Sequence, residues 1–244
     1  MKKLLFFNLF LPSILLASNN FSLSLSSGVN NSVYKTKKQQ NSYVLPTLDI
    51  QYNGFFIESS EIGYTFWGDE TLSLSISSEF FAGYPIKGKD LKVGYQNIEK
   101  RKSQIMSGLS LDYKFLEDNY LSLSTNFGKK GNKTSLNILR SITLPHNFLF
   151  VPSIYGNIYS RDFSNYYFGI TADEAKKNSL ITAPYSVKET YAVGVSMALE
   201  KKLNKSFSIY TFGSYEVLSN TIKKSPIVKK DYFWTVGGGL KYAL

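Results

Sequence analysis

The chain contains no cysteine and a single histidine, His146. Without cysteine there is no disulfide framework, no thiolate metal site and no cysteine to carry a lipid anchor. A histidine between Pro145 and Asn147 is typical of a solvated turn, whereas a catalytic base lies beside a nucleophile that it activates. Phosphate-binding and dinucleotide-binding glycine motifs are also missing. We therefore predict no enzyme activity, no metal and no cofactor.

Long apolar runs are confined to the N-terminus, and no later stretch is long enough to cross a bilayer as a helix. The first residues follow the order of a secretory signal: Lys2 and Lys3, an apolar run over 4–16, and small residues at its end. We predict a cleaved signal peptide at 1–18 and one mature domain at 19–244. Export from the cytoplasm excludes nucleic acid as a partner, despite a formal charge of +10.

The rest of the chain consists of short blocks in which apolar and polar residues alternate. Phe21, Leu23 and Leu25 are interleaved with serines, and the last block runs from Tyr232 to the final residue. Alternation of this kind predicts strands with one apolar and one polar face. Aromatic residues make up 16% of the chain, which suits the two interfacial girdles of a membrane barrel. We predict an all-β fold: a closed antiparallel transmembrane β-barrel in the outer membrane of a Gram-negative-type cell, in contact with lipid.

The number of strands depends on one block, 55–66. Its apolar residues change from odd to even positions, which requires a bulge or a turn near Glu58–Glu61. A turn there gives twelve strands, with short periplasmic turns and long external loops. The alternative is ten strands, with 21–34 outside the barrel. The candidate strands are 21–34, 43–53, 55–66, 71–81, 103–115, 119–128, 134–144, 148–159, 187–200, 205–217 and 230–244.

Arginine 140 interrupts one of the apolar faces. Arg140 has the same parity as Leu136 and Ile138 and would face lipid. An arginine at mid-depth costs about 2–4 kcal/mol. The sequence does not decide between a local bulge that turns Arg140 inward and a partner that it faces.

Lysines concentrate in the segments expected to be external loops. Basic loops of this kind can contact lipopolysaccharide phosphates, and the alternative is a solvated, solubilising surface. The lysines and one arginine concerned are Lys35, Lys37, Lys38, Lys87, Lys89, Lys92, Lys100, Arg101, Lys102, Lys129, Lys130, Lys133, Lys223, Lys224, Lys229 and Lys230.

Two local motifs carry further expectations. Gly239, Tyr242 and Leu244 resemble the C-terminal signal by which the barrel assembly machinery binds outer-membrane proteins, although the usual final residue is Phe. In the long segment 160–186, Thr171 and Glu174 have the spacing of a helix capping box, which predicts a short helix that orders this loop.

Four motifs together resemble the MipA/OmpV family of outer-membrane proteins. The most specific are Asn165-Tyr166-Tyr167-Phe168-Gly169-Ile170-Thr171-Ala172-Asp173-Glu174-Ala175 and Ser225-Pro226-Ile227-Val228, supported by Arg101-Lys102-Ser103 and Tyr43-Val44-Leu45-Pro46. We single out Tyr167, Gly169, Ile170, Ser225, Pro226, Ile227 and Val228 as family-motif loop residues.

The resemblance implies a non-catalytic scaffold for murein synthesis and turnover. In that role the protein would bring a lytic transglycosylase and a penicillin-binding protein together through its periplasmic turns. The alternative function is a small pore, or a surface adhesin or lipopolysaccharide-binding barrel. The polar strand faces do not decide whether the interior is packed or conducts ions.

Overall fold

The structure is a computed structural model that describes residues 20–244. The predicted signal peptide at 1–18 lies outside the described residues. The strands are β1 (Asn20–Asn31), β2 (Gln40–Tyr52), β3 (Phe55–Glu58), β4 (Glu61–Gly68), β5 (Leu72–Ala82), β6 (Gln104–Phe115), β7 (Asn119–Gly128), β8 (Gly131–Arg140), β9 (Ile142–Leu144), β10 (Phe148–Tyr159), β11 (Thr190–Lys202), β12 (Phe207–Leu218) and β13 (Tyr232–Ala243). The helices are η1 (Gly88–Asp90), α1 (Arg161–Phe168), α2 (Ala172–Lys176) and α3 (Asn220–Lys223).

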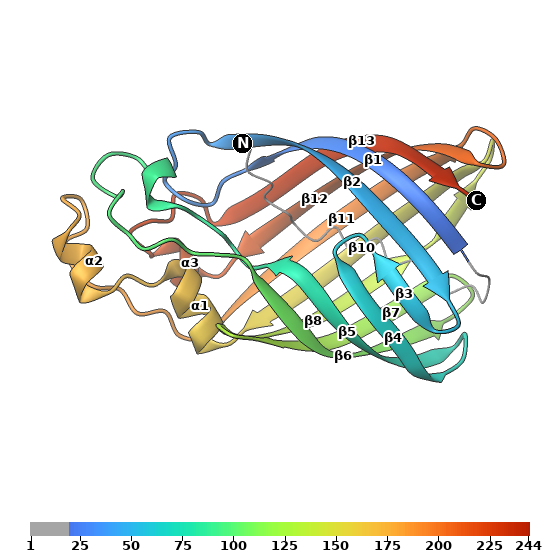
Figure 1. Cartoon of the computed structure of the whole chain (residues 1–244), viewed down its shortest axis with the longest axis horizontal. Coiled ribbons are helices and arrows are strands. Elements are labelled where there is room, and N and C mark those ends of the chain that lie inside the picture. Colours follow the sequence, from blue (N-terminus) through green and yellow to red (C-terminus); the bar gives the residue numbers. More distant parts are fainter. Residues whose placement is uncertain (1–19) are drawn as a thin grey trace.

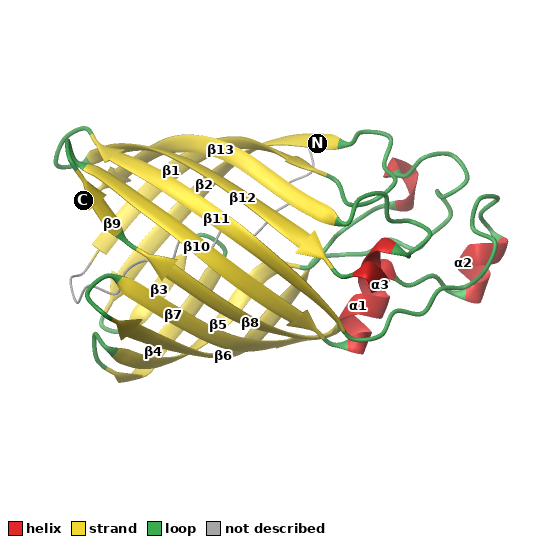
Figure 2. Cartoon of the chain, turned by 180° about the vertical axis from the view of Figure 1, so that it is seen from behind, coloured by secondary structure: helices red, strands yellow, loops and turns green. Residues whose placement is uncertain are grey.

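All of these strands belong to one antiparallel sheet that closes on itself (Figures 1 and 2). Closure is complete at the ends of the chain because β13 pairs with both β12 and β1. The β8 and β9 segments lie end to end against β10, with a break at Ser141, so they count as one strand. The barrel therefore has 12 strands, as predicted.

The irregular block 55–66 is split at the predicted place. A turn at Ser59 and Ser60 separates β3 from β4, and Ser59 has a positive φ of 52°. The split produces the even strand number and rules out the ten-strand alternative. The short β3 reaches only residues 49–52 of β2. Residues 40–48 of β2 therefore have ladder partners, among the described residues, only on β1.

The connections are less regular than expected. The turn at Ser59 and Ser60 points toward the end of the barrel that carries the long loops, although it is short. At the same end, β7 and β8 are joined by a tight turn at Lys129 and Lys130. These two short turns therefore lie at the same end as the four longest connections (Figure 1).

The strand faces have the polarity of a membrane barrel. Leu23 and Leu25 are exposed on the outside, whereas Ser22, Ser24 and Ser26 are buried inside. The outer surface is apolar, as contact with lipid requires. The backbone groups in the strand ladders form their hydrogen bonds within the sheet, so they need no water. No helix among residues 20–244 is long and apolar enough to span a membrane.

Arg140 lies at the edge of the barrel wall. It is exposed, ends β8 and pairs with Asn119, the first residue of β7 next to the short turn 116–118. Its exposed side chain has the outward direction that its parity predicts. The break in the ladder follows at Ser141, whose amide donates to Asp118 O at 2.8 Å.

The C-terminal residues complete the sheet. Gly239 pairs with Ser26 and Tyr210, and Tyr242 packs on Phe207 at a centroid distance of 5.0 Å. Leu244 is exposed. Their role as an assembly signal stays a prediction.

Candidate functional site

Four connections fold together into a cap over one end of the barrel (Figure 2). We call residues 32–39, 83–103, 160–189 and 219–231 the loop cap. The helices α1, α2 and α3 all belong to it. Its core is a continuous apolar cluster that also includes strand ends and consists of Val33, Tyr34, Ala82, Tyr84, Ile86, Leu91, Ile98, Met106, Tyr159, Phe163, Tyr167, Phe168, Ile170, Ala175, Ile181, Val187, Ala192, Leu218, Ile222, Ile227, Val228 and Phe233.

The family-motif loop residues meet inside this cap. Tyr167 is fully buried and its hydroxyl donates to Ala82 O at 3.2 Å and Lys102 O at 2.9 Å. Burial raises the pKa of Tyr167, so the hydroxyl stays protonated. The Ser225 hydroxyl donates to Phe168 O at 2.6 Å and thereby links the last loop to α1. The motifs thus lie side by side, although 57 residues separate Phe168 from Ser225.

The other motif residues also contribute to the packing of the cap. Ile170 and Tyr185 exchange backbone hydrogen bonds of 2.8 and 2.9 Å. Ile227 is buried, and its carbonyl accepts from Lys35 N at 2.8 Å. Val228 forms a bridge with Tyr34, and Pro226, between Ser225 and Ile227 in the sequence, is half-buried. A side chain at Gly169 would collide with Asn165. These contacts are structural, and no motif side chain forms a reactive group.

A buried ion pair fixes α2 to the neighbouring loop. Arg101 and Glu174 approach to 2.8 Å, with exposed side-chain fractions of 6% and 4%. The Glu174 carboxylate also accepts from the amides of Glu99 at 2.8 Å and Thr171 at 3.0 Å. Burial acts to raise the pKa of Glu174, but the hydrogen bonds from Arg101, Thr171 and Glu99 outweigh it and lower that pKa. The predicted capping box is confirmed, whereas Arg101 was expected to lie in a basic external surface and is a buried partner instead.

The single histidine lies in an exposed turn, outside the loop cap and its buried ion pair. His146 is exposed in the turn between β9 and β10 and has a positive φ of 62°. Among residues 20–244 there is no group of three or more His, Asp and Glu side chains arranged to hold a metal ion.

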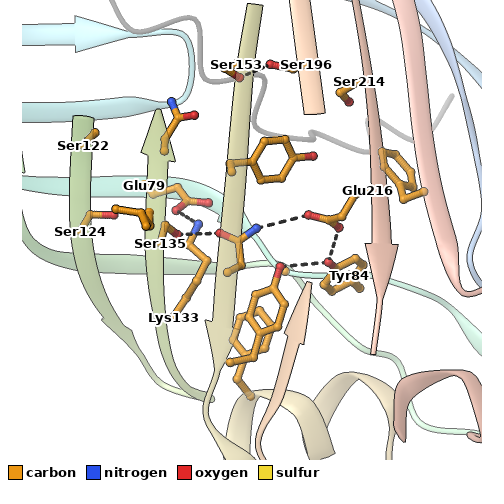
Figure 3. A pocket seen from close by; sticks show the side chains of 18 of the residues that line it. Glu79, Tyr84, Ser122, Ser124, Lys133, Ser135, Ser153, Ser196, Ser214 and Glu216 are labelled. Atoms are coloured by element: carbon orange, nitrogen blue, oxygen red, sulfur yellow. Dashed lines mark hydrogen bonds and ion pairs between the residues drawn. The ribbon is translucent and has the colours of Figure 1, made fainter. Parts of the chain in front are cut away.

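A cavity of about 110 Å³, lined by both polar and aromatic side chains, lies in the lumen below the cap (Figure 3). Lys133 and Glu79 form an ion pair of 2.6 Å at its side. Across the cavity, Glu216 accepts from the Tyr84 hydroxyl at 2.9 Å and from the Asn157 amide at 3.3 Å. Lys133 was expected in an external loop, but it lies in β8 and points inward. Glu79 has the parity of the inward-facing serines of β5, and this signal could have placed it in the lumen.

Charge is distributed unequally between the two ends. The short turns 69–71 and 116–118 expose Asp69, Glu70, Glu117 and Asp118. At the other end, the exposed lysines are Lys37, Lys38, Lys89, Lys92, Lys100, Lys102, Lys129, Lys130, Lys176, Lys177, Lys188, Lys223, Lys224 and Lys229. Lys176, Lys177 and Lys188 were not among the lysines predicted; the prediction of basic loops is confirmed for the other residues of this list, whereas Lys35, Lys87 and Lys230 are half-buried.

The chain is similar in sequence to several outer membrane proteins. A 24 kDa outer membrane protein of Pasteurella multocida is 32% identical over 87% of this chain and 86% of its own length. The MltA-interacting protein of Escherichia coli is 25% identical over 93% and 91% of the two chains. Outer membrane protein OmpV of Vibrio cholerae is 27% identical over 84% and 80%. Among solved structures, the NanC porin aligns with a TM-score of 0.48 and 9% identity, over 88% of this chain and 98% of that chain.

The model of one protein family matches almost the whole barrel. It is the family described as MltA-interacting protein MipA, and the match extends over residues 23–244. The chain belongs to the MltA-interacting protein MipA family and is a β-barrel of the outer membrane.

Proposed function

We propose that this barrel is a non-catalytic scaffold that connects the outer membrane to the machinery of murein turnover. Its partner would be a lytic transglycosylase, and a penicillin-binding protein would complete the assembly. The observation that carries the proposal is the family match over residues 23–244, because the family is described by its interaction with MltA. The barrel would bind a lytic transglycosylase of its own organism.

The short-turn end of the barrel is the surface that fits such a partner. The turns 69–71 and 116–118 are neighbours because Leu72 pairs with Tyr113 in the β5–β6 ladder. Each of these two turns exposes two acidic residues, and we call the four residues Asp69, Glu70, Glu117 and Asp118 the acidic turn pair. Opposite charge on a partner would steer it to this rim and fix its orientation.

One member of the acidic turn pair is held in place by the backbone. The Asp69 carboxylate accepts from the amides of Thr71 at 2.7 Å and Leu72 at 3.1 Å. These hydrogen bonds lower the pKa of Asp69, so its negative charge persists under mildly acidic conditions. A fixed charge loses less side-chain entropy on binding than a freely rotating one.

The loop cap faces the opposite end and has a different role in this proposal. Its family-motif loop residues stabilise the cap, and no member of the set is assigned to partner contact. Because the apolar core of the cap lies across the lumen, we expect no steady ion conductance, which disfavours the small pore.

A second candidate function uses the outer surface of the cap. The exposed lysines would contact lipopolysaccharide phosphates, with each near-surface charge contributing on the order of 1 kcal/mol. The observation that favours this candidate is the concentration of exposed lysine at the loop end, whereas the other end exposes acid at turns 69–71 and 116–118 and, among residues 20–244, only two exposed lysines, Lys202 and Lys205, beside the β11–β12 turn. The two functions use opposite ends of the barrel and are compatible.

Photo-crosslinking in intact cells tests the scaffold proposal. A photoreactive residue replaces Glu117 in one variant and Lys223, on the loop cap, in the matched control. The proposal expects a crosslinked product with a lytic transglycosylase for Glu117 and none for Lys223. A product from Lys223 alone, or none from any short turn of a folded barrel, contradicts the proposed surface.

A further inference from the structure

The lumen contains a buried amide side chain that no group of residues 20–244 satisfies. Asn137 points into the cavity below the loop cap and is 9% exposed. Within the described part of the chain, neither its amide nitrogen nor its amide oxygen has a hydrogen-bond partner. A buried polar group without a partner costs about 1–3 kcal/mol, so its retention requires a compensating bond to something else.

The strand register surrounds Asn137 with further polar groups. In the ladders of β8, Asn137 lies between Ser122 on β7 and Tyr155 on β10. The next inward row joins Ser124, Ser135 and Asn157 in the same way. We call these six residues the polar wall, and all of them line the cavity. Inward-facing side chains of three adjacent strands therefore offer hydroxyl and amide groups to one space.

An aromatic surface completes this site. Tyr155 pairs across the β10–β11 ladder with Gly194. A Cβ added at Gly194 would come within 2.5 Å of the Tyr155 ring, so the ring lies over the backbone of β11. The absence of a side chain at Gly194 thus lets the Tyr155 ring lean over β11, on the side of β10 opposite to β8 and Asn137, and both side chains line the same cavity. Pockets of this kind combine apolar surface with a few placed polar groups.

The charged groups of the cavity are already engaged within the protein. Lys133 is paired with Glu79 at 2.6 Å. Glu216 accepts hydrogen bonds from Tyr84 and Asn157. What the site offers to a ligand is therefore the neutral donor and acceptor of Asn137 and the aromatic face of Tyr155, because the Ser135 hydroxyl already donates to Asn157 Oδ1 at 2.7 Å and Ser153 is bonded to Ser196 at 2.6 Å. This set is complementary to a solute with many hydroxyl groups, a hydrocarbon face and no net charge.

We propose that the lumen holds a binding site for a small neutral saccharide, with Asn137 and Tyr155 as its main contacts. The cavity of about 110 Å³ exceeds the 10–15 Å³ that one water molecule requires. The loop cap covers the external end, so the solute enters from the short-turn end. This site rests on the lumen alone and is independent of the acidic turn pair and of the scaffold proposal.

Ligand-observed NMR on the refolded barrel in detergent tests the site with glucose as the probe. Glucosamine and glucuronate serve as cationic and anionic relatives of the same size. We expect saturable glucose binding and at least tenfold weaker binding of both charged relatives. Absence of saturable glucose binding by the folded barrel, or tighter binding of either charged relative, overturns the proposal.

Two variants locate the binding in the lumen. Asn137→Leu has nearly the same volume and should weaken glucose binding at least fivefold, because two hydrogen bonds are lost. Asn126→Leu is the matched control: Asn126 is buried with an unpartnered oxygen on the adjacent strand, but it does not line the cavity. It should leave the affinity unchanged. Equal glucose affinity of N137L and the original chain overturns the assignment.

A stability measurement separates binding from a structural role. Without glucose, Asn137→Leu should have the same Tm as the original chain or a higher one, because it removes an unsatisfied buried amide. A clear fall in Tm would assign Asn137 to the structure and overturn the proposal. If N137L does not fold, Tyr155→Leu provides the same affinity test, with the same fivefold loss expected.

Discussion

Removal of the Glu174 carboxylate should open the loop cap while leaving the barrel intact. In Glu174→Ala, the Arg101 guanidinium stays buried without its anionic partner, and the amides of Glu99 and Thr171 lose an acceptor. Removing one partner of a buried ion pair typically costs about 3–5 kcal/mol. The loss falls on the segment around α2, since none of these groups belongs to a strand of the barrel wall.

Limited proteolysis measures this opening directly. Lys176 and Lys177 are exposed trypsin sites at the end of α2 and adjoin Glu174. When opening is fast, cleavage follows the population of the open form, so a loss of about 3 kcal/mol raises the rate on the order of 100-fold. The heat-modifiable mobility of the barrel on gels should not change.

Two further variants make the test specific. Asp173→Ala removes an exposed carboxylate from the same helix and should change cleavage by less than about threefold. The double variant Arg101→Met with Glu174→Met replaces the pair by apolar side chains of similar size and should restore most of the protection. Unchanged cleavage of E174A, or equal effects of E174A and D173A, would refute the role assigned to the buried pair.

Three other predictions concern the cap and the turn. The pKa of Glu174 is lower in the folded protein than its ordinary value of 4.5. The stability that Glu174 gives the cap is therefore complete above pH 4.5 and is lost as the pH falls through the folded pKa. Tryptic mapping of acid-pulsed protein should show opening of the cap only below about pH 4.5. Gly83→Ala should destabilise the cap, because Gly83 has a φ of +96° and a Cβ there collides with the Tyr167 ring; hydrogen exchange of α1 should increase. His146→Ala should leave lipid-hydrolysis assays of the folded barrel unchanged, since this side chain is exposed in a turn; a loss of hydrolysis would indicate an enzyme.

Local sequence patterns predicted the wall of the barrel well. Alternation identified the strands, and the parity change in 55–66 located the turn between β3 and β4 that fixes the strand number. Such signals succeed because side-chain direction in a strand depends only on position along it. The capping box of α2 is equally local, since Thr171 and Glu174 are three residues apart.

Contacts between distant segments were not predictable in the same way. Arg101 and Glu174 are 73 residues apart, and the loops that carry them have no periodicity from which a register follows. Lys133 was placed in a loop because lysines surround it, whereas the ladder continues through it and its parity turns it toward Glu79. Arg140 raised a difficulty only because the sequence gives the side of the wall but not the depth along it.

The affinity of the purified barrel for a purified lytic transglycosylase of the same organism tests the central claim most directly. Nanodiscs leave both ends of the barrel accessible, and biolayer interferometry measures the binding. The scaffold account predicts saturable binding that weakens at least tenfold in a variant with Glu117→Lys and Asp118→Lys, and that is unchanged by Lys223→Glu with Lys224→Glu. Absence of binding by the folded barrel, or dependence on the loop-cap lysines instead of the acidic turn pair, would contradict it.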